Sequence, residues 1–203
     1  LVRGASKGEG LGNKFLSHIR EVDAVAYVLR CFEDSDITHV ENRIDPVADA
    51  ETVETELMLA DLDSCEKRLA SVEKKAKGGD KEAKAQAALL EKALALLREG
   101  KPARMAKLTA EEEPGWRLLQ LLTAKPVVYV CNVEEGSAAT GNALSAKVEA
   151  RAKEEGAACV VISAKIEAEL AGLAPDERQA FLAELGLEEP GLNKLIRAGY
   201  DLL

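Results

Sequence analysis

The sequence is poor in aromatic residues and has no long apolar run. Aromatic side chains make up 3% of the residues, which disfavours a base-stacking platform for single-stranded nucleic acid. No apolar run reaches the roughly 20 residues that span a bilayer, so we expect no membrane segment. None of the four cysteines, Cys31, Cys65, Cys131 and Cys159, forms a C-x-x-C pair. Zinc and thioredoxin-like sites are therefore disfavoured, and the cysteines are predicted to be small buried side chains in a reducing cytoplasm.

The charge balance is acidic. The chain has 36 Asp and Glu against 27 Lys and Arg, a net charge of −9. An acidic chain is a poor general binder of phosphate backbones, although a local basic patch can still bind them. With 203 residues, 47% of them hydrophobic, the sequence can form one medium domain or a smaller domain with an insertion.

Three short apolar runs predict buried strands at 24–32, 126–133 and 157–163. Each is almost continuously apolar and rich in Val, which is typical of a parallel sheet covered on both faces. Helical patterns surround them. One precedes the first strand with Phe15, Ile19 and Val22 on one face, one joins the second and third strands and ends at Gly156, and two form the C-terminal tail.

Residues 47–122 have a different character, poor in β-branched residues and rich in Ala, Leu, Glu and Lys. Apolar residues recur there at spacings of 3 and 4, the pattern of a coiled-coil seam: Leu62, Cys65, Leu69, Val72 and Ala76, then Ala87, Leu90, Leu94 and Leu97. Gly78 and Gly79 can turn the chain and Asp80 can cap the second helix. We predict an antiparallel helical hairpin, and a packed four-helix subdomain is the alternative.

Polar residues follow the second and third predicted strands. Asn132 and Glu135 lie in the stretch "YVCNVEEG", residues 129–136. Ser163 and Ala164 begin the stretch "SAK", residues 163–165. Ligands of open α/β sheets bind outside the carboxyl ends of the strands. An Asn carboxamide can pair with the N7 edge of a purine, and a backbone N–H can meet an exocyclic acceptor. The two loops predict a nucleotide-base site, although an ordinary polar strand-end turn would look similar.

These loops resemble the base-recognition loops of P-loop GTPases, whose usual forms are N-K-x-D and S-A-K. Here Val133 replaces the Lys and Glu135 replaces the Asp. In the usual form the Asp accepts hydrogen bonds from guanine N1 and N2, whereas adenine has an acceptor at N1 and no 2-amino group. The resemblance therefore implies base-binding roles for Asn132, Val133, Glu135, Ser163 and Ala164, with relaxed guanine selectivity or an adenine preference.

The Gly-rich start, "LVRGASKGEGLGNKFLSHIRE", resembles the second switch region of the Obg-related GTPases, with Leu1, Gly4, Gly8, Gly10 and Gly12. Together with "CFEDSDITHVENRIDP", "KKAKGGDKEAKA" and "LGLEEPGLNKLIRAGYDLL", it is similar to the YchF, or Obg-like ATPase, subfamily over essentially the whole chain. This resemblance implies a partial Ras-like α/β nucleotide-binding domain, residues 1–46 and 123–203, with an inserted α-helical coiled-coil domain, residues 47–122.

The resemblance also implies missing parts. No G-x-x-x-x-G-K-[ST] phosphate loop occurs in the sequence, and neither the D-x-A-G motif nor the C-terminal TGS domain of the family is present. We expect the chain to be a piece of a longer protein that is inactive alone. Mg²⁺ would be bound with ATP mainly by the missing P-loop portion, with no metal site in this fragment.

A catalytic residue must also be found, because Leu1 occupies the place of the Gln that orients water in many relatives. The resemblance implies His39 as the substitute; a loop His with an unrelated hydrogen bond is the alternative. We expect a monomeric, cytoplasmic, ribosome-associated protein that binds the large subunit and hydrolyses ATP or GTP. The alternatives are a GTP-preferring Obg-type switch and a non-enzymatic module built on the helical hairpin, whose Lys-rich tip, 74–81, could contact RNA phosphates.

Overall fold

The computed structural model describes residues 4, 12–34, 36–37 and 43–203, which divide into two compact units. One unit contains the described residues up to Asp23 together with Glu51–Pro126, and the other contains Ala24–Ala50 together with Val127–Leu203. The predicted functional boundaries, 1–46 with 123–203 and 47–122, remain a prediction.

The second unit is built on a three-stranded parallel sheet in the order β1-β2-β3. The strands are β1 (Val25–Arg30), β2 (Val127–Asn132) and β3 (Ala158–Ile162). β2 is central, and its register pairs Arg30 with Asn132 on one side and Asn132 with Ile162 on the other. The predicted α/β class with a parallel sheet is confirmed, and each strand lies within its predicted range.

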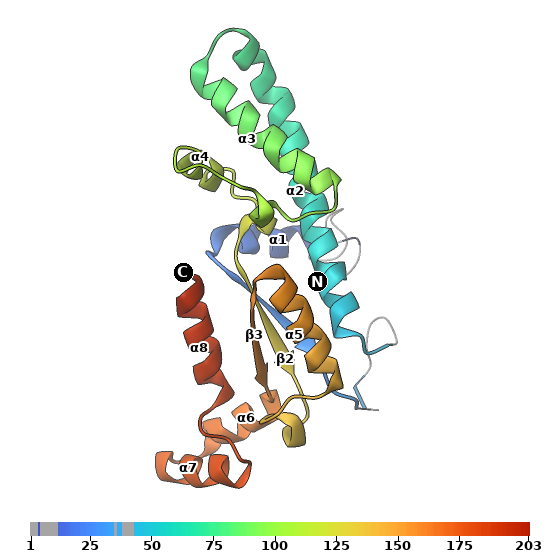
Figure 1. Cartoon of the computed structure of the whole chain (residues 1–203), viewed down its shortest axis with the longest axis vertical. Coiled ribbons are helices and arrows are strands. Elements are labelled where there is room, and N and C mark those ends of the chain that lie inside the picture. The colour runs from blue at the N-terminus through green and yellow to red at the C-terminus, as the bar shows by residue number, and fades with distance from the viewer. Residues whose placement is uncertain (1–3, 5–11, 35, 38–42) are drawn as a thin grey trace. The chain divides into compact units, whose positions relative to one another are not determined.

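Helices cover this sheet on both sides. α5 (Ala143–Glu155) and α8 (Gly191–Leu202) both contact β2 and β3 and lie on opposite sides of the strands (Figure 1). Asn142 caps α5 by accepting hydrogen bonds from the backbone N–H groups of Leu144 and Ser145 at 3.0 and 2.9 Å. Gly156 ends it in the left-handed conformation, φ +67°, which suits glycine.

Three further elements complete the unit: η4 (Glu135–Ser137), α6 (Ala164–Gly172) and α7 (Pro175–Glu184). A small apolar cluster joins them, with Ala138, Ile166, Leu170 and Leu182 buried at its centre. The sequence patterns did not predict α6, which begins directly after β3. Its position matters because the S-A-K residues stand at the start of this helix.

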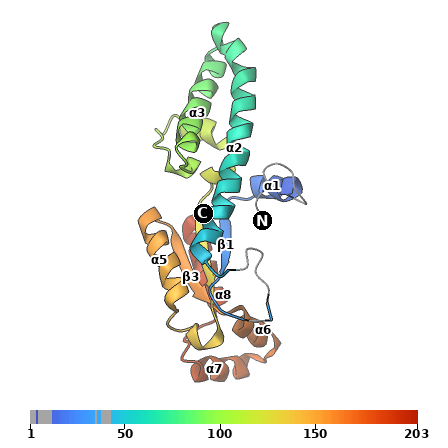
Figure 2. The ribbon, with the colours of Figure 1, turned by 90° about the vertical axis from the view of Figure 1, so that its right-hand side faces the viewer.

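The first unit contains the helical hairpin. α2 (Pro46–Lys77) is long, 32 residues or roughly 48 Å at 1.5 Å per residue, and α3 (Lys81–Arg98) runs back beside it (Figures 1 and 2). The Asp80 side chain accepts from the backbone N–H groups of Glu82 and Ala83 at 2.9 and 3.1 Å, which confirms the predicted cap. Cys65, Leu90 and Leu94 of the predicted seams are buried in one core cluster.

Shorter elements surround the hairpin: α1 (Gly12–Glu21), η2 (Ala103–Met105), α4 (Glu113–Arg117) and η3 (Leu122–Ala124). The predicted apolar face of α1 is confirmed at Ile19 and wrong at Phe15 and Val22. The helix buries Leu16 and Ile19, whereas Phe15 and Val22 are 50% and 44% exposed. The i, i+3 pair Leu16 and Ile19 is enough to anchor a helix of three turns.

A buried carboxylate fixes α2 to the chain that follows α4. Asp61 is fully buried and accepts three hydrogen bonds at 2.8 Å, from the backbone N–H groups of Leu122 and Thr123 and from the Thr123 hydroxyl. Burial raises the pKa of Asp61, while these hydrogen bonds oppose the rise. The arrangement satisfies a charge that would otherwise be costly to bury.

The cysteines are free thiols, with Cys31, Cys65 and Cys131 buried and Cys159 half-buried. This agrees with their predicted role as small packing residues. Within the described part of the chain, every helix is too short or too polar to cross a bilayer.

Candidate functional site

The two predicted base-recognition loops meet at the carboxyl end of the sheet. The Asn132 side-chain oxygen, at the end of β2, accepts a hydrogen bond from the backbone N–H of Ala164 at 2.9 Å. Ala164 is the first residue of α6, so its N–H has no acceptor within the helix. Because β2 and β3 are parallel neighbours, their following loops must leave the sheet side by side.

A second contact joins the same loops. The Lys165 ammonium lies 2.9 Å from a Glu135 carboxylate oxygen, and the two side chains are 69% and 41% exposed. The hydrogen bond to Glu135 raises the pKa of Lys165. Glu135, which replaces the Asp of the N-K-x-D motif, thus already has a cationic partner in Lys165.

Val133 takes no exposed position in this loop. Its side chain is 2% exposed, and its backbone N–H donates to the Ile162 carbonyl at 2.9 Å, which continues the pairing of β2 with β3. A base-contacting side chain must reach the surface, so Val133 contributes to the loop through its backbone and its packing. A role for Val133 in base contact remains a prediction.

Ser163 lies between β3 and α6 at the cap position of the helix. Its side chain is 2% exposed. Among the residues that the structure describes, its hydroxyl has no hydrogen-bond partner. A buried hydroxyl without a partner is unusual and costs free energy. The Ser163 hydroxyl is therefore an unpaired polar group next to the Asn132–Ala164 contact at the start of α6.

A hydrogen-bond network fixes the loop after β2 against β1. The Asn142 side-chain amide donates to the Cys31 carbonyl at 2.7 Å and to a Glu134 carboxylate oxygen at 3.0 Å. The Ser137 hydroxyl donates to the other Glu134 oxygen and lowers the pKa of Glu134. Glu134 is exposed and supports the loop through these two contacts, whereas Glu135 is half-buried and pairs with Lys165.

This site offers hydrogen-bonding groups of both kinds in one small area. The Asn132 side chain brings its N–H donors, since its oxygen already accepts from Ala164, α6 brings the backbone N–H groups that follow Ala164, and the Lys165–Glu135 pair brings a donor beside an acceptor. Such a set can read the edge of a heterocyclic base, which also presents donors and acceptors in fixed positions.

The other predicted site residues lie mostly outside the described residues. These are His39, Leu1, Gly8 and Gly10. Gly4 is described: its φ is +83° and its backbone N–H donates to a Glu56 carboxylate oxygen at 2.8 Å. Gly12 begins α1.

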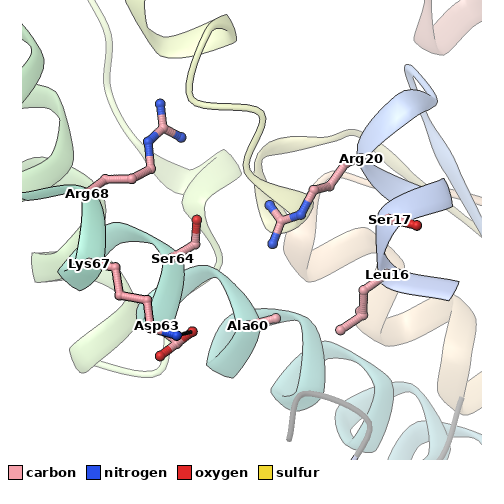
Figure 3. A pocket seen from close by; sticks show the side chains of 8 residues that line it. All are labelled: Leu16, Ser17, Arg20, Ala60, Asp63, Ser64, Lys67 and Arg68. Carbon is pink, nitrogen blue, oxygen red and sulfur yellow. Dashed lines mark hydrogen bonds and ion pairs between the residues drawn. The ribbon is translucent and has the colours of Figure 1, made fainter. Parts of the chain in front are cut away.

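The helical unit has a pocket of about 440 Å³ between α1 and α2 (Figure 3). Arg20 and Arg68 face it from the two helices. The Arg68 guanidinium donates to the Leu119 carbonyl at 2.7 Å, and Arg20 donates to the Gln120 carbonyl at 3.3 Å. The third lining cation, Lys67, pairs with Asp63 at 2.7 Å. Arg20 and Arg68 hold the chain that follows α4, and Lys67 pairs with a carboxylate of its own helix, so the strand-end loops are the stronger candidate site.

No group of three or more His, Cys, Asp or Glu within the described ranges is placed to hold a metal ion. The described residues therefore do not make an Mg²⁺ site by themselves. Binding of Mg²⁺ with ATP through a P-loop portion remains a prediction.

Sequence reasoning missed the roles of Lys165, Glu134 and Asn142. The opposite charges of Lys165 and Glu135, each three residues past the end of a neighbouring parallel strand, could have suggested the ion pair. Asn142 directly precedes a helical pattern and so carries an N-cap signal. Its second function, reaching back to the Cys31 carbonyl, depends on tertiary structure that no local pattern contains.

No family model matches the chain. It is 51% identical over 203 residues to the "Ribosome-binding ATPase YchF" of Escherichia coli O157:H7 and 49% identical over 205 residues to that of Bacillus subtilis (strain 168); each alignment covers 100% of this chain and 56% of the relative. The solved structure of the Schizosaccharomyces pombe YchF GTPase matches with a TM-score of 0.83 and 32% identity, over 96% of this chain and 53% of that one. The chain thus spans about half the length of the relatives it matches.

Proposed function

Because the chain belongs to the YchF family of the Obg-related P-loop GTPases, we propose that the intact protein binds and hydrolyses ATP, with GTP as a second substrate. The observation that carries the proposal is the Asn132–Ala164 hydrogen bond, which joins the two loops where a base would be read. The identity of 51% to a protein named as a ribosome-binding ATPase supports the same reading.

In this proposal the described residues bind and orient the base, and phosphate chemistry takes place elsewhere in the intact protein. Asn132 reads the purine edge, and backbone N–H groups at the start of α6 meet an exocyclic acceptor. His39 positions the attacking water, since a neutral imidazole suits that task near pH 7. Mg²⁺ supplies charge neutralisation on the phosphates when nucleotide is bound.

The ribosome is the proposed partner, in the cytoplasm, with the protein acting as a monomer. The tip of the helical hairpin carries Lys74, Lys75, Lys77 and Lys81, all exposed. Lys77 pairs with Glu73 at 3.5 Å, in an ion pair that is weak because both side chains are in water. These lysines can contact the phosphates of ribosomal RNA, particularly those of the large subunit.

A hydrolysis assay tests the enzymatic part. The intact protein is incubated with ATP and Mg²⁺, with and without ribosomes, and phosphate release is measured over many turnovers. Release well above the buffer rate supports the proposal. Ribosome binding without any hydrolysis would instead favour the non-enzymatic interaction module, in which the hairpin binds the partner.

The contribution of the hairpin tip is measured separately. Replacement of Lys74, Lys75 and Lys81 by Glu should weaken ribosome co-sedimentation and reduce its salt dependence, because each phosphate contact releases counterions. Replacement of three exposed lysines elsewhere, Lys14, Lys147 and Lys153, is the matched control for charge. Equal losses in both triple variants would argue against a role for the tip.

A further inference from the structure

We propose that the pocket between α1 and α2 binds a phosphate monoester, which Arg20, Arg68 and Ser64 hold by direct hydrogen bonds. Every residue that lines the pocket belongs to the helical unit, whereas the strand-end loops belong to the other unit. The pocket is therefore a second site, and phosphate binding there does not depend on the function proposed above.

Two arginines reach the pocket from different helices. Arg20 lies in the last turn of α1, and Arg68 lies within α2. Ser64 precedes Arg68 by four residues, so these two side chains lie on the same face of α2. In Figure 3 the Ser64 hydroxyl is turned towards the space between the two arginines, while Lys67 and Asp63 are turned away from them. Three hydrogen-bonding side chains thus meet on one side of the pocket.

Backbone carbonyls orient both guanidinium groups but use only some of their donors. Nη1 of Arg68 donates to the Leu119 carbonyl at 2.7 Å, and Nη1 of Arg20 donates to the Gln120 carbonyl at 3.3 Å. Nη2 of Arg68 also reaches the Leu118 carbonyl, at 3.5 Å. A guanidinium group has five N–H donors, so each arginine keeps donors for a ligand. Because the side chains are already ordered, the entropic cost of binding is lower.

These contacts hold two positive charges at one turn of the chain. Leu119 and Gln120 are consecutive, and Gln120 has a φ of +50°, which is uncommon for a residue other than glycine. Within the described part of the chain, neither guanidinium forms an ion pair. Like charges held at one place repel each other, so an anion bound between Arg20 and Arg68 is favoured.

The carboxylates on this part of α2 are bonded to other groups. Asp61 accepts from Leu122 and Thr123, Asp63 pairs with Lys67 at 2.7 Å, and Glu66 pairs with Arg98 at 2.9 Å. Their negative charge weakens any general attraction of anions to this surface, as does the net charge of −9 of the whole chain. Anion binding here must therefore come from direct hydrogen bonds with the two guanidinium groups, which favours a specific ligand over loosely held counterions.

A phosphate monoester matches this donor set better than a carboxylate does. Its three terminal oxygens are strong acceptors, enough for two guanidinium groups and one hydroxyl, and Arg pairs with phosphate through two parallel hydrogen bonds. The pocket volume of about 440 Å³ exceeds the need of one phosphate and falls in the usual range of ligand sites. Leu16 and Ala60 add apolar surface. The pocket therefore has room for the molecule that carries the phosphate, either a small organic phosphate or the 5′ end of an RNA.

Calorimetric titration of the intact protein with ribose 5-phosphate, a small phosphate monoester, tests the pocket. Ser64→Asp places a carboxylate between the two arginines and leaves their bonds to the backbone in place. Ser71→Asp, at an exposed position of the same helix, is the matched control for added charge. We expect saturable binding by the unmodified protein and by Ser71→Asp. Binding by Ser64→Asp should be weaker by about tenfold or more, the effect of losing one charge-assisted hydrogen bond.

A second pair of variants keeps the test independent of the folding of Ser64→Asp. Arg20→Gln removes a guanidinium whose backbone contact is long, at 3.3 Å, so the unfolding temperature should change little. Arg117→Gln removes an arginine whose side chain is 82% exposed and serves as the control. Ribose 5-phosphate should bind about tenfold more weakly to Arg20→Gln, and its affinity for Arg117→Gln should be unchanged.

Two RNA probes of the same sequence, with and without a 5′-phosphate, separate the sources of the phosphate. Binding of ribose 5-phosphate that Ser64→Asp weakens identifies a small organic phosphate as the ligand. If only the 5′-phosphorylated RNA binds in a way that depends on Ser64 and Arg20, the ligand is an RNA end. The absence of saturable binding of either probe, or binding that Ser64→Asp and Arg20→Gln leave unchanged, would overturn the proposal.

Discussion

The side-chain oxygen of Asn132 accepts a hydrogen bond from the backbone N–H of Ala164 at 2.9 Å, across 32 residues of sequence. One residue thereby ends the central strand and also anchors the first turn of the helix after the next strand. The loop that would read a base and the loop that would flank it are fixed to each other before any ligand arrives. This preorganisation lowers the cost of ordering the site on binding.

Asn132→Ala should weaken nucleotide binding in the intact protein at least tenfold, because the variant loses both the contact with the base edge and the tie to Ala164. The unfolding free energy should fall by about 1 kcal/mol, the usual net contribution of one such hydrogen bond. Calorimetry and urea unfolding measure the two effects. Asn193→Ala, at an exposed position of α8, is the matched control, and unchanged affinity in Asn132→Ala would remove the residue from the site.

Asp61→Asn should destabilise the helical unit by about 1–3 kcal/mol, the cost of leaving a buried donor unsatisfied. The Asn side chain has one acceptor oxygen, whereas Asp61 uses both of its oxygens to accept three hydrogen bonds. Urea unfolding monitored by circular dichroism measures the change. Asp63→Asn, an exposed change on the same helix, should alter stability by less than about 0.5 kcal/mol. Equal effects of the two substitutions would contradict this account of Asp61.

Much of the fold follows from local sequence. The Val-rich runs predict all three strands, because a continuous apolar run is typical of strands buried on both faces. The expected burial holds for the central strand β2, whereas in β1 one face is exposed, with Val28 68% exposed. The hairpin follows from its 3 and 4 spacing and from Asp80. Helix α6 could not be found in this way, because its buried positions, Ile166 and Leu170, make only one i, i+4 apolar pair in a helix of nine residues.

The site was only partly predictable for a related reason. Asn132 and Ala164 could be brought together from the parallel arrangement alone, since both follow neighbouring strands. The burial of Val133 also follows from the sequence, because the buried strand predicted over 126–133 includes it, and its backbone N–H continues the pairing to Ile162. The contact between Asn142 and Glu134 could not be predicted, because it joins the start of α5 to the loop after β2.

His39→Ala should slow hydrolysis by the intact protein at least several-fold and leave nucleotide affinity almost unchanged. A positioned general base contributes about 100- to 10,000-fold in rate, and a group that orients water acts on the transition state rather than on bound substrate. Single-turnover kinetics and a binding titration measure the two quantities. His18→Ala, in α1, is the control. Parallel losses of rate and affinity would indicate a structural role for the loop.

The 203-residue chain alone should release no phosphate above background from ATP or GTP. Phosphoryl transfer is catalysed mainly by positioning and charge stabilisation of the phosphates, and the chain has no phosphate-loop motif to supply them. The same preparation should still show a cooperative unfolding transition, which excludes misfolding as the cause. Sustained multiple-turnover release from the purified chain would disprove this expectation.

The central claim, that the strand-end loops read the base of ATP, is tested most directly by calorimetric titration of the intact protein with ATP and GTP analogues. The account predicts ATP binding at least as tight as GTP binding. It also predicts a shift toward GTP in Glu135→Asp, because the shorter carboxylate separates from Lys165. Val133 stays unchanged in this variant, because Val133→Lys would bury a charge at a position that is 2% exposed and destabilise the fold. Tight GTP binding with no ATP binding in the unmodified protein would contradict the account.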